Sequence, residues 1–528
     1  MKYGKNCCAG LRRRRALQWG KHISIEKVAK EFRHLEFAHG RQKNSLSSRC
    51  ESGPAASKAN PFSRVDKRAA VGENWGGFSG AKRMKKDLLT RRDFVRLGAA
   101  VAGAAASATL LETPLLDAQP QPGGRKIRFV SIGTGIRGCD LLRSARKVPA
   151  GELVATADLY EMHRKAGLEA YGADVPAVGD YRPLLDRKDV DAVIVAVSDH
   201  LHRAVVLDCL AAGKDVYCEK PMSHNVADGF AMVDAVKANG RIFEAGSQRV
   251  SNIVYKKARE IYASGRLGEV TYIEGHSDRN SPSGAWVYPI PPDASEQTID
   301  WKAFLRDAPP RPFDAVRFFR WRCFTDYGEG VAGDLFVHLL SGIQCVSGIN
   351  AAPRRAQSSG SLTHFKDGRD FPDLLATLYD YDEVTVNLHC NQNNAQGEPI
   401  VFYGKEATMT INGNTLIVAP QDTKPQPEGY SLNGWTAAAK RQYLDEWNAA
   451  HPEPAASLAE VETYSAAPGY DDTADHLAAF FRAVETREPV VENEIFGNHA
   501  AIACHMANYS YFHHGAAIWD EHTRNIVG

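Results

Sequence analysis

The feature that most constrains the fold of this chain is a glycine pattern directly after a short apolar segment. Residues 126–132 (KIRFVSI) are rich in β-branched and aromatic side chains, which is typical of a buried strand. Residues 133–138 (GTGIRG) follow at once, and a helix is expected from Arg137 to Lys147. This order of strand, glycine-rich turn and helix predicts the first unit of a dinucleotide-binding Rossmann domain.

Each glycine of the turn has its own steric reason. Gly133 permits the tight turn, Gly135 lets the backbone approach a pyrophosphate, and Gly138 lets the helix pack against the strand. The helix then offers its first amides, at Ile136 and Arg137, to the phosphates. These five residues are therefore predicted to bind the cofactor.

A second strand supplies a carboxylate at the expected distance. Residues 152–157 read as a strand that ends in Asp158, twenty residues beyond Gly138. A carboxylate there accepts hydrogen bonds from the adenosine ribose hydroxyls and repels a 2′-phosphate. The sequence therefore predicts NAD as the cofactor in preference to NADP.

Strands and helices continue to alternate. Strands are expected over 190–197, 214–218 and 241–245, with helices over 204–212 and 227–239. This alternation predicts a doubly wound parallel sheet, in which ligands lie beyond the carboxyl ends of the strands. The loops at those ends add predicted cofactor contacts, with packing an equal alternative for His202: Ser198, His200, His202, Glu219, Lys220 and Gln248.

The second half of the chain has a different pattern, with runs of strands and later helices. This arrangement predicts an α+β domain. The strands are expected over 270–275, 374–381, 384–389, 401–404 and 407–411, and the closing helices over 476–486 and 496–510.

One segment of this half carries chemistry. Residues 321–344 (WRCFTDYGEGVAGDLFVHLLSGIQ) contain a glycine-rich loop that runs into a helix. Asp334 and His338 stand four residues apart where this helix begins. That spacing places both side chains on one helix face, one turn apart.

Taken together, these motifs resemble the Gfo/Idh/MocA oxidoreductase family. The matching pieces are GTGIRG, DHLH at 199–202, AGKDVYCEKPM at 212–222 and GSQR at 246–249. The resemblance implies a Rossmann domain over 125–248 and an α+β domain with an open, mostly antiparallel sheet over 249–528. It also implies hydride transfer between a nicotinamide cofactor and a carbinol of a sugar or polyol.

By the same resemblance, Lys220, Asp334 and His338 form the catalytic set. Hydride leaves a carbinol carbon only as the hydroxyl proton is removed, and a histidine titrates near working pH. Asp334 is an alternative proton acceptor. Lys220 can hydrogen-bond the hydroxyl, stabilise its developing charge, or share the proton transfer. The sequence leaves the choice among the three open.

Other side chains near these motifs are substrate candidates. Arg249 follows the predicted end of the Rossmann domain, and Trp321, Arg322 and Tyr327 precede Asp334. Arg249, at the domain junction, is a predicted substrate contact. Trp321, Arg322 and Tyr327 are predicted to form a sugar platform with a polar clamp, with core packing as the alternative for the aromatic residues. The adjacent histidine and cysteine pairs, at 389–390 and 513–514, lack a third ligand at suitable spacing, so no metal site is expected.

The N-terminal region has the pattern of a targeting signal. A twin arginine at 91–92 and Phe94 precede an Ala- and Gly-rich stretch, which resembles a twin-arginine (Tat) export signal. Export signals lie at the true N-terminus, so translation is expected to begin at Met84, with residues 1–83 a non-native or disordered extension. Residues 84–124 are then the signal and a linker, with cleavage after Ala108 or near Ala118. A periplasmic protein is expected.

Charge and hydropathy limit the partners. Residues 1–83 carry 19 Lys and Arg against 6 Asp and Glu, whereas the remainder carries 45 against 57. An acidic body argues against nucleic-acid binding. No uncharged apolar run reaches the roughly 20 residues of a membrane span, so none is expected after processing. An open sheet face needs a cover, which favours a homodimer or homotetramer.

Export shapes the expected function, because free NAD is scarce outside the cytoplasm. The leading hypothesis is an oxidoreductase that acts on a sugar or polyol carbinol and holds its cofactor tightly. One alternative is an NAD-dependent glycoside hydrolase that oxidises its substrate transiently. Another is a nucleotide-binding sensor without turnover, against which the joint presence of Lys220, Asp334 and His338 argues.

Overall fold

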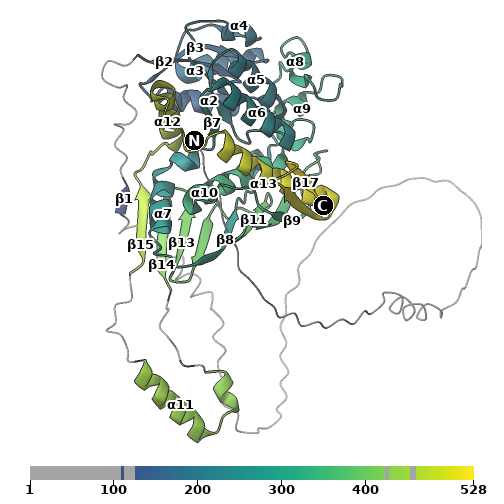
Figure 1. Cartoon of the computed structure of the whole chain (residues 1–528). Coiled ribbons are helices and arrows are strands. Elements are labelled where there is room, and N and C mark those ends of the chain that lie inside the picture. Colours follow the sequence, from purple (N-terminus) through teal and green to yellow (C-terminus); the bar gives the residue numbers. More distant parts are fainter. Residues whose placement is uncertain (1–108, 112–124, 422–426, 428, 452–459) are drawn as a thin grey trace, which may run out of the picture. The chain divides into compact units, whose positions relative to one another are not determined.

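The computed structural model describes residues 109–111, 125–421, 427, 429–451 and 460–528 (Figure 1). The predicted extension and nearly all of the predicted signal and linker lie outside the described residues. No helix in the described ranges is long and apolar enough to cross a membrane.

The Rossmann sheet is parallel throughout, as predicted. Its six strands stand in the order β4-β3-β2-β5-β6-β7, which reverses direction beside β2. The chain crosses from β4 to β5, on the other side of β2, and the change of order between β2 and β5 leaves a crevice at the carboxyl ends of these two strands. The strands are β2 (Ile127–Ile132), β3 (Gly151–Ala157), β4 (Ala177–Val178), β5 (Ala192–Val195), β6 (Asp215–Glu219) and β7 (Phe243–Gly246).

Helices from two distant parts of the chain cover this sheet. The local ones are α2 (Ile136–Ala145), α3 (Glu161–Tyr171), α4 (Arg182–Leu185), α5 (Asp199–Ala211) and α6 (Val226–Asn239). Near the C-terminus, α12 (Asp472–Thr486) packs Phe480 and Phe481 into the same core as Phe129 of β2. A residue more than 300 positions away thus completes the core of the Rossmann domain.

The second sheet has eleven strands in the described ranges and is mostly antiparallel, as the family resemblance implied. Only the β8·β11 and β1·β15 pairs are parallel. Its strands, in spatial order, are β1 (Thr109–Leu111), β15 (Glu462–Ala466), β14 (Thr415–Pro420), β13 (Ala407–Asn412), β12 (Ile400–Gly404), β8 (Val270–His276), β11 (Thr385–Asn391), β10 (Leu374–Asp380), β9 (Arg355–Ser361), β16 (Ala516–Asp520) and β17 (Asn525–Val527).

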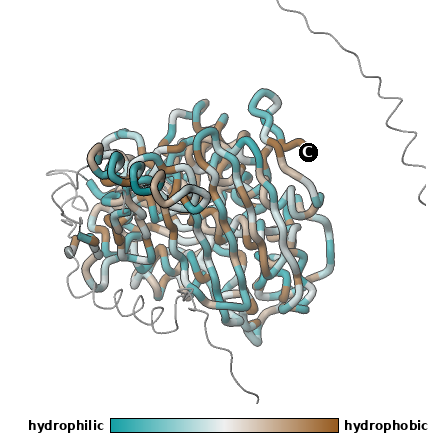
Figure 2. The backbone as a smooth tube through the Cα atoms, turned by 90° about the horizontal axis from the view of Figure 1, so that it is seen from below, coloured by the Kyte–Doolittle hydropathy of each residue, from teal (hydrophilic) through white to brown (hydrophobic). Residues whose placement is uncertain are grey.

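Three helices lie along one face of this sheet: α7 (Ile253–Ala263), α10 (Val337–Ser347) and α13 (Glu494–His513) (Figure 1). Burial alternates along the strands, because every second side chain points to the helices, and the hydropathy alternates with it (Figure 2). α13 contacts both β9 and α6, so it joins the two sheets. The other helices are α8 (Trp301–Leu305), α9 (Ala315–Phe319) and α11 (Ala437–Ala450).

One buried carboxyl sits where α12 meets the Rossmann sheet. Glu244 is 1% exposed, and burial raises the pKa of its carboxyl well above the usual range. His476 Nε2 donates to the carbonyl of Ala245 at 2.9 Å, so its Nδ1 carries a lone pair. Ser251 Oγ donates to that Nδ1 at 2.9 Å, and Glu244 Oε1 lies 3.3 Å from the same nitrogen. Burial lowers the pKa of His476 to about 4, so the pair is neutral at neutral pH.

This pair makes stability depend on pH. The pKa of Glu244 is higher in the folded protein than in the unfolded chain. Glu244 therefore contributes fully to stability at pH values below its pKa in the unfolded chain, and this contribution is lost as pH rises towards its pKa in the folded protein. Between about pH 5 and pH 8, the free energy of unfolding measured with urea should fall less for Glu244→Gln than for the native protein. Glu169→Gln, at an exposed position on α3, should show the same change of unfolding free energy with pH (the same slope) as the native protein. Equal slopes for all three proteins would contradict a neutral Glu244.

Candidate active site

The glycine turn has the geometry that a pyrophosphate needs. Gly133 has φ of +89°, and a Cβ there would lie 2.3 Å from the carbonyl oxygen of Ala196. Gly135 is the N-cap of α2, and no side chain caps the helix there. The amides of the first turn are therefore free of a side-chain acceptor, which suits a bound phosphate.

Asp158, at the end of β3, is fixed beside this turn. Its carboxylate accepts hydrogen bonds from the backbone amides of Thr134 at 2.7 Å and Tyr160 at 2.9 Å, and lies 3.3 Å from His163 Nδ1. Burial opposes the charge, but His163 and the two amides hold the pKa of Asp158 below its usual range. An ionised carboxylate therefore stands where the ribose hydroxyls of a dinucleotide would lie.

A single cavity of about 1150 Å³ runs from this turn to the second sheet domain. It joins most of the side chains that the sequence singled out, although they come from segments more than 200 residues apart. The predicted residues that line it are Gly133, Gly135, Ile136, Arg137, Asp158, Ser198, Glu219, Lys220, Gln248, Trp321, Arg322, Asp334 and His338.

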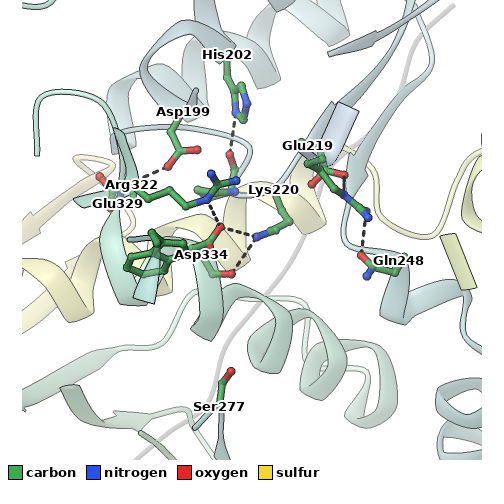
Figure 3. Close-up of polar contacts among 12 residues, drawn as sticks. Asp199, His202, Glu219, Lys220, Gln248, Ser277, Arg322, Glu329 and Asp334 are labelled. Atoms are coloured by element: carbon green, nitrogen blue, oxygen red, sulfur yellow. Dashed lines mark hydrogen bonds and ion pairs between the residues drawn. The ribbon is translucent and has the colours of Figure 1, made fainter. Parts of the chain in front are cut away.

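Asp334 is the centre of the polar contacts at the far end of the cavity (Figure 3). Lys220 Nζ donates to its Oδ1 and to its backbone oxygen, both at 2.9 Å, and Arg322 Nε donates to Oδ1 at 3.0 Å. Trp286 Nε1 donates to Oδ2 at 3.0 Å. Burial opposes ionisation, but Lys220 and Arg322 hold the pKa of Asp334 well below its usual range. Asp334 is therefore a fixed carboxylate that orients Lys220.

Lys220 keeps one donor for a ligand. An ammonium group has three protons, and Asp334 accepts two of the hydrogen bonds. The Lys220 side chain is 10% exposed and lines the cavity, so the third donor is available there.

His338 stands one helical turn further on. Asp334 lies in a π-helical turn, Ala332–Phe336, and α10 begins at Val337, so the regular helix expected through both residues is widened between them. Burial, followed by the charges of Lys220 and Arg249, lowers the pKa of His338 well below its usual range. Within the described part of the chain, neither ring nitrogen of His338 has a hydrogen-bond partner. A neutral imidazole therefore lines the cavity with its nitrogens uncommitted.

A second ion pair lines the cavity between the glycine turn and Lys220. Arg137 Nε donates to Glu219 Oε1 at 2.7 Å, and Arg137 Nη2 donates to Gln248 at 3.3 Å (Figure 3). Burial opposes the charge of Arg137, but Glu219 raises its pKa. The pair ties the start of α2 to the ends of β6 and β7, and so fixes the turn relative to Lys220.

Several predicted residues lie beside the cavity. His200 Nε2 is 2.7 Å from the carbonyl oxygen of Phe304, and His202 Nδ1 is 2.9 Å from that of Pro221. Burial lowers the pKa of each to about 4. These histidines position loops, which for His202 matches the packing alternative. The residues outside the lining are Gly138, His200, His202, Arg249 and Tyr327.

Two of the substrate candidates, Tyr327 and Arg249, lie outside the cavity lining and contact other parts of the protein. Tyr327 has no exposed surface and packs in the core of the second domain, its ring centroid 5.0 Å from that of Phe304. Its side chain is therefore not placed to form the predicted sugar platform, because the surrounding rings enclose it. Arg249 Nη2 donates to Glu398 at 2.5 Å and so braces the loop before β12.

Trp286 and Asp199 were missed by the sequence interpretation. Trp286 binds Asp334 from a loop 48 residues away, and no local pattern marks it. Asp199 is the first residue of the DHLH motif that was recognised, and it lines the cavity, whereas the two histidines of the motif do not. Burial raises the pKa of Asp199 well above its usual range. A carboxylate just after the end of a predicted strand, where ligands bind in such sheets, was the available signal.

Comparison with known proteins supports the family resemblance over the first domain. Residues 127–247 match the model of the Gfo/Idh/MocA oxidoreductase family, described as an NAD-binding Rossmann fold. An inositol 2-dehydrogenase of Salmonella typhimurium (strain LT2) is 32% identical over 146 residues, which make up 27% of this chain and 44% of that protein. One from Gluconacetobacter diazotrophicus is 33% identical over 144 residues, or 27% and 43% of the two chains. The chain thus spans less than half the length of these relatives.

Solved structures extend the likeness to the second domain. Levoglucosan dehydrogenase in complex with NADH matches with a TM-score of 0.53 at 18% identity, over 74% of this chain and 98% of that one. The aldose-aldose oxidoreductase of Caulobacter crescentus matches with a TM-score of 0.53 at 16% identity, over 75% and 100%. This chain is therefore similar in sequence to the Gfo/Idh/MocA oxidoreductases over its Rossmann domain, and similar to such dehydrogenases in fold over 74% of its length.

Proposed function

We propose that this protein is an NAD-dependent oxidoreductase that transfers hydride between its cofactor and a carbinol of a sugar or polyol. The proposal rests mainly on one observation: a cavity joins the first turn of α2, whose amides have no side-chain cap, to Lys220, Asp334 and His338. The inositol 2-dehydrogenases that match the first domain support this class of substrate. The family description of the matched residues supports NAD.

Gly133, Gly135 and the first amides of α2 would hold the pyrophosphate, and Asp158 the adenosine ribose. When bound there, NAD supplies the hydride acceptor. Lys220 uses its free donor to hold the substrate hydroxyl, while Asp334 keeps the ammonium in place. His338 accepts the hydroxyl proton at a ring nitrogen, because its lowered pKa keeps it neutral at neutral pH. Arg322 keeps Asp334 ionised throughout.

If His338 is the base, activity should fall on the acid side of the pH profile (its acid limb) only at unusually low pH. The neutral imidazole is the competent form, and a lowered pKa means that it persists as pH falls below the ordinary histidine value of about 6.5. The fall in kcat/KM should therefore have its midpoint below that value. His338→Gln should lower kcat and remove this limb. An unchanged limb in the variant would assign the titration to another group.

The state of the purified protein tests the proposal directly. Protein prepared without added nucleotide is denatured, and any released cofactor is identified by chromatography. Stoichiometric NAD is expected for an enzyme that holds its cofactor tightly. A protein with neither bound NAD nor measurable affinity for NAD or NADP would overturn the oxidoreductase proposal.

We further propose that the protein is exported through the Tat pathway from a start at Met84, on the strength of the twin arginine at 91–92. The native precursor should then begin at Met84, and the processed form should appear in the periplasm. Edman sequencing of both forms checks this. A precursor that begins at Met1 would contradict it.

A homodimer or homotetramer is also part of the proposal. Leu374 and Leu378 of β10 and Tyr403 of β12 are large apolar side chains with 38%, 47% and 40% exposure. They leave apolar surface on strands of the large sheet, and a second copy would cover it.

A further inference from the structure

The end of the cavity around Asp334 is both aromatic and cationic. Trp286, Tyr288 and Trp321 contribute rings to its lining, and Arg279 and Arg322 contribute guanidinium groups. The rings suit the C–H faces of a sugar. The two arginines go beyond what a neutral polyol requires.

The guanidinium group of Arg322 is held in one orientation and keeps hydrogen-bond donors free. Its Nε donates to Asp334 at 3.0 Å, and its guanidinium lies 4.2 Å from the ring centroid of Trp321. These two contacts set the plane of the group. Its terminal nitrogens have no hydrogen-bond acceptor among the residues that the structure describes, although they can donate four hydrogen bonds.

Arg279 is only partly neutralised. Its Nη2 donates to Glu398 Oε1 at 3.0 Å, and the same carboxylate accepts from Arg249 Nη2 at 2.5 Å and from Ser277 Oγ at 2.7 Å. One carboxylate therefore serves two guanidinium groups. Glu398 does not line the cavity, whereas Arg279 does.

The charges around Asp334 do not balance. Lys220, Arg279 and Arg322 line the cavity as cations. Lys220 and Arg322 both pair with Asp334, whereas Arg279 pairs with Glu398, which already accepts from Arg249. Asp199 adds little negative charge, because burial, together with Asp334 and Glu329, raises its pKa well above the usual range. The end of the cavity therefore carries an excess of positive charge beside unpartnered guanidinium donors.

We propose that the substrate carries a carboxylate, as an aldonic or uronic acid does, and that Arg279 and Arg322 bind it. The carbinol to be oxidised then lies at Lys220 and His338. This inference rests on the proposed oxidoreductase function and narrows its substrate class. A planar carboxylate suits two guanidinium forks, and such charge-assisted hydrogen bonds are stronger than those of a neutral hydroxyl.

The test compares ligands that differ only in the acid group. Glucuronic acid and galacturonic acid are each compared with their methyl ester and with the parent sugar, and gluconate is compared with glucitol. Two quantities are measured on the full chain with NAD: the rise in melting temperature and the rate of NADH formation. At least one acid should stabilise the protein more than its neutral partners and exceed them about tenfold in kcat/KM. Added salt should narrow this gap.

Two variants locate the effect. Arg279→Gln should raise KM for the preferred acid about tenfold and remove its advantage in melting temperature. Lys256→Gln removes a cation from an exposed position on α7, outside the cavity, and should leave the preference intact. Arg322 is unsuitable for this test because it also holds Asp334.

The outcomes separate this inference from the function beneath it. Equal binding and turnover of acids and neutral sugars would overturn the inference and leave the oxidoreductase standing. A preference for acids that survives in Arg279→Gln would also overturn it. An acid that stabilises the native protein but not Arg279→Gln, without any hydride transfer, would support the carboxylate site and refute the oxidoreductase.

Discussion

Replacing Lys220 by Met is expected to lower kcat by about 10²–10⁴-fold, the range for loss of a group that handles charge or a proton in the transition state. The variant keeps the hydrophobic stem but removes all three donors. Arg322 and Trp286 still hold the Asp334 carboxylate, so the fold should survive. The measurement is the rate of NADH formation at saturating substrate, with NAD content determined on the same preparation.

The control must show that the loss belongs to the site. Lys165→Met removes an exposed lysine that pairs with Glu161 one turn away on α3, and it should leave kcat unchanged. A Lys220→Met protein with bound NAD and kcat within threefold of the native value would remove Lys220 from the mechanism. Loss of NAD together with activity would instead indicate that Lys220 mainly holds the cofactor.

The Rossmann domain could be predicted closely because its signals are local. The buried strands are short apolar runs, and the helix after the glycine turn was expected from Arg137 and begins at Ile136. The turn itself needs glycine at fixed positions for steric reasons that a sequence displays. Parallel order followed from the alternation of strands and helices.

The rest depended on contacts that no local pattern records. Asp334 is held by Trp286 and Arg322 as well as by Lys220, and the three come from separate segments. The four-residue spacing of Asp334 and His338 suggested a regular helix, yet a π turn separates them. Tyr327 stands in sequence beside the site residues but faces the core, since neighbours in a loop can point in opposite directions.

Gly138→Ala is expected to abolish stoichiometric cofactor while the protein stays folded. A Cβ on Gly138 would lie 2.1 Å from the carbonyl oxygen of Gly133, which is backbone and cannot rotate away. The start of α2 would have to move away from the turn, and overpacking of this kind costs about 1–3 kcal/mol of stability. The turn that presents the first amides of α2 to the pyrophosphate would move with it. NAD content per chain and the urea midpoint measure the two effects.

Gly434→Ala is the matched control for this steric effect. The chemical change is the same, but a Cβ at Gly434 would meet no atom within 4 Å. NAD content and the urea midpoint should then stay at their native values. If Gly138→Ala also kept full NAD content, the close approach of α2 to the turn would not be what positions the cofactor, and the pyrophosphate would have to lie elsewhere in the cavity. If both variants lost NAD, the loss would follow from any glycine replacement, and the specific contact with Gly133 would not explain it.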